Sequence, residues 1–351
     1  MKRKSKRSLA LLLTGALLAG LLPMGTGGKS LAAEQPALRN PRILKTTQET
    51  AQGSSEKKEL KNPITENGIT TWDCIWFGNY WQEDTNGDGK ADRNDEKTPI
   101  KWRVLSVEGD DVFLLADKNL DCQRYNDTEA DVTWETCTMR SWLNGYEAEM
   151  NRAGKDYSDN NFLDHAFSAD EQTAIKTADV VNNDNPGYGT EGGIDTADKV
   201  YLMSVDEVMK TEYGFTSSAD IITSTRQAVD TAYTEAGGEI GDGDMSSTVD
   251  YWWLWSPGCN SNYASFTGGD GYVNTYGFNV DYDIFVAVRP VLHLNLSSDS
   301  SWSYAGTVTS DGGGREWNFK TSRFSVTDKT RRHAETTRDC GTGICREERA
   351  E

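Results

Sequence analysis

Twelve residues, 84–95, have the side-chain types and spacing of a calcium-binding loop. Side-chain oxygens fall at positions 1, 3, 5, 9 and 12 of this run, glycine stands at position 6, and position 7 offers a backbone carbonyl. A hard cation such as Ca²⁺ gathers about six or seven oxygens from this spacing, while the glycine permits a tight turn. We therefore expect a lone structural calcium site. Its expected ligands are Asp84, Asn86, Asp88, Lys90, Asp92 and Asp95.

A strand-like segment precedes this loop and Pro99 follows it, so the loop is not flanked by the helix pair of an EF-hand. The aspartate at position 12 is shorter than the usual bidentate glutamate, which resembles the calcium loops of dockerins and some other extracellular proteins. The alternative is a solvated acidic loop, whose clustered carboxylates would repel one another without a cation.

A second segment, Cys259 to Phe285, has the composition of a recognition surface. It consists almost wholly of Gly, Asn, Tyr, Ser, Asp, Thr and Phe. Tyr supplies rigid amphipathic contact area, and Ser, Asn and Gly supply adaptable hydrogen bonding. The alternative is an ordinary glycine-rich pair of strands. On the first interpretation the ligand-binding residues are Asn260, Asn262, Tyr263, Ser265, Phe266, Tyr272, Asn274, Tyr276, Phe278, Asn279, Asp281, Tyr282, Asp283 and Phe285.

No catalytic residue is predicted. The three histidines, His165, His293 and His333, are too scattered in sequence to build a zinc site. A Cys or Ser nucleophile needs a positioned base, and Cys259 has no second cysteine close to it in sequence. We interpret His293 as a half-buried, aromatic-sized residue of a strand. A secreted hydrolase or oxidase that acts on cell-surface polymers or proteins is the competing functional class.

Residues 1–33 have the layout of a secretory signal peptide. A basic start is followed by a short apolar core, Leu9 to Leu22, and then by small residues for cleavage at 30–33. Such a core is too short to span a membrane. We expect a secreted or cell-envelope-associated protein without a transmembrane segment. The basic residues at the start are Lys2, Arg3, Lys4, Lys6 and Arg7.

The charge balance is strongly acidic. The chain has 55 Asp and Glu against 36 Lys and Arg, a formal net charge of −19, and residues 1–33 hold six of the basic residues and none of the acidic ones. An acidic field repels phosphate backbones, so a nucleic-acid partner is not expected. The expected partner is an extracellular protein or glycan.

Six cysteines in 351 residues do not make a disulfide framework. Cys340 and Cys345 close a short loop and are plausible mutual partners. The other four are interpreted chiefly as small buried hydrophobic residues. They are Cys74, Cys122, Cys137 and Cys259.

The patterns predict an α+β fold of antiparallel hairpins, with two or three short helices and long loops. Strands are expected at 72–80, at 99–107 and 112–116 in a hairpin, at 199–204, at 251–258 and at 286–294. A helix is expected at 138–144, and the capping boxes at 168–171 and 204–207 each open one. Residues 214–250 are expected to be mostly loop, with 225–233 as a candidate helix. We expect a disordered linker at 34–68, one domain at 69–296, an irregular or β extension at 297–326 and a disordered tail at 327–351.

A set of landmarks runs in order through this domain. They are 75–80, 99–105, 120–121, 125–126, Trp134, 140–144, the region of Phe162 and Phe167, 200–204, 252–258 and 288–292. Together they resemble an uncharacterised bacterial domain family with a C-type-lectin-like fold of the formylglycine-generating-enzyme type. In that family, the segment before the closing Val-Arg-Pro strand is often mutagenised at adenines by a diversity-generating retroelement.

This resemblance implies a non-catalytic ligand-binding protein with a diversified surface at 260–285. Trp253, Pro257, Arg289 and Pro290 would hold that surface in place, with Arg289 paired to a buried carbonyl or carboxylate. The sequence departs from the family at Trp255, where an Arg is usual, and at Ala287, where a Gly is usual.

Overall fold

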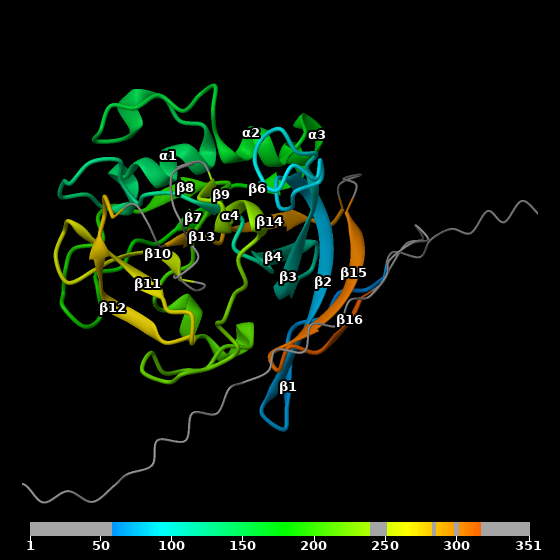
Figure 1. Cartoon of the computed structure of the whole chain (residues 1–351). Coiled ribbons are helices and arrows are strands. Elements are labelled where there is room, and N and C mark those ends of the chain that lie inside the picture. Colours follow the sequence, from blue (N-terminus) through cyan, green and yellow to red (C-terminus); the bar gives the residue numbers. More distant parts are fainter. Residues whose placement is uncertain (1–57, 239–250, 283–285, 298–301, 317–351) are drawn as a thin grey trace, which may run out of the picture. The chain divides into compact units, whose positions relative to one another are not determined.

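The computed structural model describes residues 58–238, 251–282, 286–297 and 302–316. Two β-sheets, a short hairpin and a few short helices make up this part of the chain (Figure 1). The α+β class predicted from the sequence is therefore confirmed. The predicted signal peptide and C-terminal tail lie outside the described residues.

The larger sheet has nine strands in the described part of the chain, and its pairs are antiparallel. Its order is β16-β15-β2-β3-β4-β14-β6, with β1 paired to β2 and β9 paired to β14. The strands are β1 (Ile64–Glu66), β2 (Ile69–Tyr80), β3 (Thr98–Glu108), β4 (Asp111–Ala116), β6 (Ile175–Lys176), β9 (Val200–Tyr201), β14 (Val291–Asn295), β15 (Ser303–Thr309) and β16 (Gly314–Glu316).

The smaller sheet carries the predicted recognition segment. Its order is β12-β11-β10-β13-β5, and its β10–β13 pair is parallel. The strands are β5 (Asp121–Cys122), β10 (Trp252–Pro257), β11 (Tyr263–Thr267), β12 (Val273–Asn279) and β13 (Ala287–Val288). A separate hairpin joins β7 (Ala178–Val180) to β8 (Thr196–Asp198).

The helices are short, with four to seven residues in each α-helix. The α-helices are α1 (Thr138–Asn144), α2 (Phe162–Ala166), α3 (Ala169–Ala174) and α4 (Ala232–Glu235). The 3₁₀ turns are η1 (Trp134–Thr136), η2 (Ala148–Met150), η3 (Glu207–Met209) and η4 (Thr211–Tyr213). In Figure 1, β10–β12 (yellow) and the β2–β15 edge (blue and orange) lie on opposite sides of the domain, while α1–α3 lie at one end.

The predicted strand at 286–294 is wrong as a single element. The structure divides it into β13, in the smaller sheet, and β14, in the larger one. Pro290 lies between them, where a residue without an N–H interrupts strand pairing, and its carbonyl accepts a hydrogen bond from Ala116 N at 3.0 Å. This crossing joins the two sheets.

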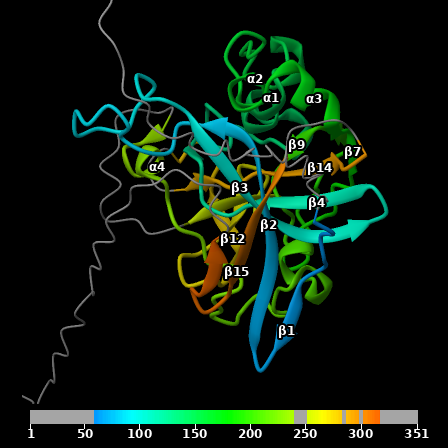
Figure 2. The same cartoon turned by 90° about the vertical axis from the view of Figure 1, so that its right-hand side faces the viewer.

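Two predicted boundaries also need correction. Folded structure begins inside the expected linker at 34–68, because Leu60 is buried and β1 pairs with β2. Asn67 and Gly68 close that hairpin with φ values of 52° and 78°, the signs that a tight β-hairpin turn requires. Figure 2 shows this hairpin extending beyond the rest of the sheet. At the other end, β15 pairs along β2, so the expected extension contributes to the main sheet.

Local predictions succeeded where turn and cap chemistry was clear. The β3–β4 hairpin, helix α1 and the Ser168–Glu171 capping box are confirmed. The reciprocal bonds of the Ser204–Glu207 box are also present, at 2.8 and 2.9 Å, although they open only the short turn η3. The strand expected at 199–204 contains only two paired residues. The helix expected at 225–233 begins instead at Ala232.

Candidate functional site

Strand β10 is a fully buried support for the segment that follows it. Trp252 and Trp253 have no solvent exposure. The indole of Trp253 donates to the carbonyl of Gln123 at 3.0 Å, and the hydroxyl of Tyr125 donates to the carbonyl of Trp255 at 2.7 Å. Buried tryptophan and tyrosine need such partners for their polar ends. The start of the predicted recognition segment is therefore fixed from within the core.

Most of the predicted ligand-binding residues reach the surface. Asn260, Tyr276 and Tyr282 are exposed. The partly exposed ones are Asn262, Tyr263, Tyr272, Asn274, Phe278, Asn279 and Asp281. Asp283 and Phe285 lie outside the described residues.

Two of the predictions are wrong, because Ser265 and Phe266 are completely buried. The hydroxyl of Ser265 donates to the carbonyl of Pro257 at 2.8 Å, which ties β11 to the end of β10. The ring of Phe266 stacks on Phe278, with centroids 4.1 Å apart and planes within 3°. Strand β11 lies between β10 and β12, and the side chains of Ser265 and Phe266 pack within the sheet.

Three tyrosines form a cluster that is open to solvent. Tyr276, on β12, meets Tyr263 from β11 and Tyr188 from a distant loop, with ring centroids 5.8 and 5.9 Å away and planes at 81° and 80°. Tyr188 and Tyr276 are each 53 % exposed. The neighbouring thiol of Cys259 raises the pKa of the Tyr276 phenol, so this phenol is neutral at physiological pH. We call Tyr188, Tyr263 and Tyr276 the tyrosine cluster.

Asn185 holds Tyr188 in this cluster. Its amide nitrogen lies 2.7, 3.1 and 2.8 Å from the carbonyl oxygens of Pro257, Gly258 and Thr275. Its side-chain oxygen accepts hydrogen bonds from the backbone N–H groups of the Gly187–Tyr188 pair. The sequence showed the loop around Asn185 only as polar, since nothing local reveals that its partners lie about 70 to 90 residues away.

A pocket of about 550 Å³ opens beside the cluster. The loop before α1, the loop around Glu191 and the turn after β10 form its walls. Arg152 donates to the carbonyl of Asp131 at 2.5 Å, and Ser261 donates to the Asp131 carboxylate at 2.6 Å. The lining residues are Asp131, Val132, Thr133, Thr136, Arg152, Thr190, Glu191, Cys259, Asn260 and Ser261. Cys259 lies both in this lining and against Tyr276, so pocket and cluster are continuous.

Arg226 fixes the far turn of the recognition segment. It is completely buried, and its five N–H groups are directed at five backbone carbonyls. The shortest of these bonds, 2.6 Å, reaches Gly271 in the β11–β12 turn. The role of Arg226 is not visible in the sequence, because a lone arginine in a polar loop gives no signal of burial. The other acceptors are Val208, Thr216, Ser218 and Ile221.

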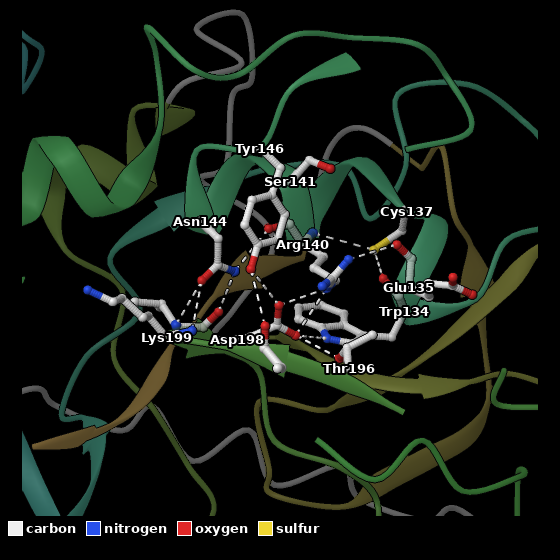
Figure 3. Close-up of polar contacts among 12 residues, drawn as sticks. Trp134, Glu135, Cys137, Arg140, Ser141, Asn144, Tyr146, Thr196, Asp198 and Lys199 are labelled. Atoms are coloured by element: carbon white, nitrogen blue, oxygen red, sulfur yellow. Dashed lines mark hydrogen bonds and ion pairs between the residues drawn. The ribbon is translucent and has the colours of Figure 1, made fainter. Parts of the chain in front are cut away.

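A buried ion pair stabilises the region around α1, next to the segment that contributes to the pocket (Figure 3). Arg140 Nε lies 2.8 and 3.0 Å from the two carboxylate oxygens of Asp198. Trp134, Tyr146 and Thr196 also donate to this carboxylate. The pair connects α1 to β8, at the end of the loop that carries Tyr188. A few residues along α1, Asn144 accepts hydrogen bonds from the backbone of 199–200 and donates to Val200.

The sequence profile of one family matches this chain at residues 109–296, and that family is described as a domain of unknown function (DUF6273). The chain belongs to the DUF6273 family. No curated protein and no solved structure matches the chain. The DUF6273 match begins in the β3–β4 turn and includes the smaller sheet, the tyrosine cluster and the pocket. Strands β1–β3, β15 and β16 lie outside it, although they pair in the larger sheet.

The predicted calcium loop precedes the DUF6273 match. Asp84, Asn86 and Asp88 accept hydrogen bonds from backbone N–H groups two to five residues further along, so their oxygens are gathered inside the loop. Asp95 closes the loop, accepting from the backbone N–H groups of Thr85, Asn86 and Asp92. In the described part of the chain, no three His, Cys, Asp or Glu side chains are grouped to hold a metal ion.

The other chemical candidates in the DUF6273 domain and its flanking strands are structural. Burial raises the pKa of the Cys74 and Cys137 thiols to about 12, so neither is a ready nucleophile. None of the four cysteines in the described residues forms a disulfide bond. His293 stacks on Phe113 and contacts Asp111 at 3.1 Å, as expected for a half-buried strand residue. No helix in this part of the chain is long and apolar enough to cross a membrane.

Proposed function

We propose that this DUF6273 protein is an exported, non-catalytic binding protein whose tyrosine cluster and adjoining pocket contact an extracellular ligand. The observation that carries the proposal is the cluster itself. Tyr188 and Tyr276 are more than half exposed, yet Asn185 and the buried strand β10 fix the backbone beneath them. Rigid, exposed aromatic side chains on an ordered scaffold bind with little loss of conformational entropy.

The finer proposal is a C-type-lectin-like fold that displays a diversified surface. The ordered landmarks support it, because several now have an architectural role in one domain: Arg140 and Asn144 secure α1, and Arg289 lies where the two sheets join. Export to the cell surface rests on residues 1–33 alone. A near-copy of the 259–285 coding segment beside a reverse-transcriptase gene would support diversification, and a neighbourhood without one would count against it.

The direct test combines binding with a stability control. We expect the full chain to bind material on an array of extracellular proteins and glycans, and the double variant Asn260→Ala/Tyr276→Ala to lose that binding. Asn260 and Tyr276 are exposed, so replacing them should leave the core intact. The double variant should therefore keep the urea midpoint of the parent chain. Binding that survives the double substitution would show that the ligand contacts another surface. A chain that binds nothing on the array would contradict the proposed binding function.

We also propose that residues 84–95 bind structural calcium. The donor set suits a hard cation, since it consists of carboxylate, amide and carbonyl oxygens. The loop is joined to the domain by Arg93, which donates to Asn160 at 3.1 Å. Calorimetry should detect binding at millimolar calcium in the parent chain and not in Asp88→Ala. No heat from the parent at that concentration would overturn the calcium proposal.

A secreted hydrolase or oxidase is less well supported. The thiol of Cys259 is partly exposed in the pocket, and it interacts with the neutral phenol of Tyr276. His293 lies on β14, a strand of the larger sheet. Turnover of a surface polymer that is lost in Cys259→Ser or His293→Gln would favour the enzyme.

A further inference from the structure

The rings of the tyrosine cluster make no cation–π contact within the described part of the chain, so they can take a cation from a ligand. Elsewhere in the protein, lysines lie over aromatic rings: Lys97 is 4.3 Å from the centroid of Trp81, and Lys155 is 4.9 Å from that of Tyr157. Among the described residues, no Lys or Arg lies over Tyr188, Tyr263 or Tyr276. Exposed aromatic faces attract cations through the ring quadrupole.

The charge around the cluster is predominantly negative. The two segments that build it, 178–198 and 251–288, contain no Lys, Arg or His. They carry exposed acidic side chains, including Asp184 and Glu191. Arg152 is the single cation in the pocket lining, where Asp131 and Glu191 outnumber it. An anionic ligand would therefore meet repulsion both here and from the whole chain, whose net charge is −19.

We propose that the ligand of this surface is a basic segment of another protein, with a lysine side chain placed against the tyrosine cluster. The inference rests on the proposed binding function and names its ligand class. The ammonium group would lie between the tyrosine faces and the carboxylates of Asp131 and Glu191. Complementary charge of this kind increases the association rate and selects against acidic partners.

The orientation of the rings favours this occupant over a flat sugar ring. Tyr263 and Tyr188 each stand nearly perpendicular to Tyr276, at 81° and 80°. Rings at right angles to Tyr276 prevent the cluster from forming one flat platform, and this arrangement suits a narrow alkylammonium chain. A sugar stacks best on one broad flat face, which rings at right angles do not form together.

Titration of the full chain with three probes tests the proposal: a capped hexalysine peptide, a capped hexaglutamate peptide and maltohexaose. We expect hexalysine to bind at least ~10-fold more tightly than either of the others, and its affinity to fall ~10-fold between low and high salt as the charges are screened. Tyr276→Leu keeps an apolar side chain but removes the ring quadrupole, and should weaken hexalysine binding by about fivefold.

Charge-matched variants separate local recognition from general attraction to an acidic protein. Glu191→Gln should weaken hexalysine binding by about threefold, whereas Glu108→Gln, which removes the same charge at the exposed end of β3 in the other sheet, should leave it unchanged. Hexalysine binding that is absent, or that Tyr276→Leu and Glu191→Gln leave unchanged, would overturn the inference. Binding of maltohexaose through Tyr276 would also overturn it while preserving the proposed function.

Discussion

Trp252 and Arg289 converge on a single acceptor. The indole N–H of Trp252 and the guanidinium of Arg289 both donate to the carbonyl oxygen of Arg226, at 3.2 and 3.3 Å. The guanidinium carbon also lies 5.0 Å from the centroid of the Trp252 ring, within cation–π range. Both side chains are completely buried. Their contact connects β10 to the point where the chain passes from the smaller sheet to the larger one.

We predict that Arg289→Ala unfolds or severely destabilises the domain. Besides Arg226, the guanidinium donates to the carbonyls of Ala116, Asp117 and Gln227. Each buried carbonyl left without a partner costs about 1–3 kcal/mol, so the free energy of unfolding should fall by at least ~3 kcal/mol. Urea denaturation followed by tryptophan fluorescence measures this loss. Arg152 is exposed, so the free energy of unfolding of Arg152→Ala should stay within about 0.5 kcal/mol of that of the parent. Equal urea midpoints for the two variants would contradict the structural role of Arg289.

Two glycines with similar backbone angles should respond differently to alanine. Gly78 and Gly87 have φ values of 69° and 76°, so both substitutions strain the backbone. A Cβ at Gly78 would lie 2.5 Å from the ring of Phe167 and 2.8 Å from the carbonyl of Ala166, whereas one at Gly87 meets nothing within 4 Å. We expect Gly78→Ala to cost about 1–3 kcal/mol more than Gly87→Ala.

Thermal unfolding of the two glycine variants, measured side by side, isolates the packing contribution because the backbone cost is common to both. A Tm for Gly78→Ala that equals that of Gly87→Ala would mean that Phe167 moves away freely. The packing of β2 against the end of α2 would then tolerate a side chain at position 78.

The features that the sequence predicts correctly are those with local causes. The β3–β4 hairpin follows from alternating side chains around Gly109, and the reciprocal bonds at Ser168 and Glu171 follow from their spacing. The hairpin turn at Asn67 was equally local, since Asn-Gly is a strong turn signal. The polar composition of 34–68 as a whole predicts a linker and obscures that dipeptide.

The features that escaped prediction depend on contacts between distant segments. Asn185 reaches carbonyls at Pro257 and Thr275, and nothing in its own neighbourhood reveals them. The burial of Phe266 depends on Phe278, whose ring covers it from the next strand. Composition correctly marked most of the 260–282 surface. It does not separate residues that face solvent from those that fill the sheet, since both use the same aromatic types.

The buried pair of Arg140 and Asp198 provides a third prediction. Asp198→Asn leaves a buried guanidinium without a countercharge, and we expect a loss of about 3–5 kcal/mol. Asp179 is exposed on β7, the strand that pairs with β8, so Asp179→Asn is a matched control with an expected change of at most about 0.5 kcal/mol. Urea midpoints give both values. Similar small losses in the two variants would show that the carboxylate charge at 198 is dispensable.

The stability supplied by Asp95 should depend on pH. Hydrogen bonds from the backbone N–H groups of Asp92, Asn86 and Thr85 hold the pKa of the Asp95 carboxyl below its usual value. A lowered pKa in the folded state stabilises the protein fully above the ordinary carboxyl pKa of about 4, and this contribution disappears as the pH falls through the lowered value. In calcium-free buffer, Asp95→Asn should therefore have a lower urea midpoint than the parent chain at neutral pH, and the gap should narrow near pH ~3. The control Glu108→Gln, at an exposed strand end, should follow the parent chain throughout. A gap between Asp95→Asn and the parent that stays constant with pH would mean that the carboxylate form at position 95 is not what closes the loop.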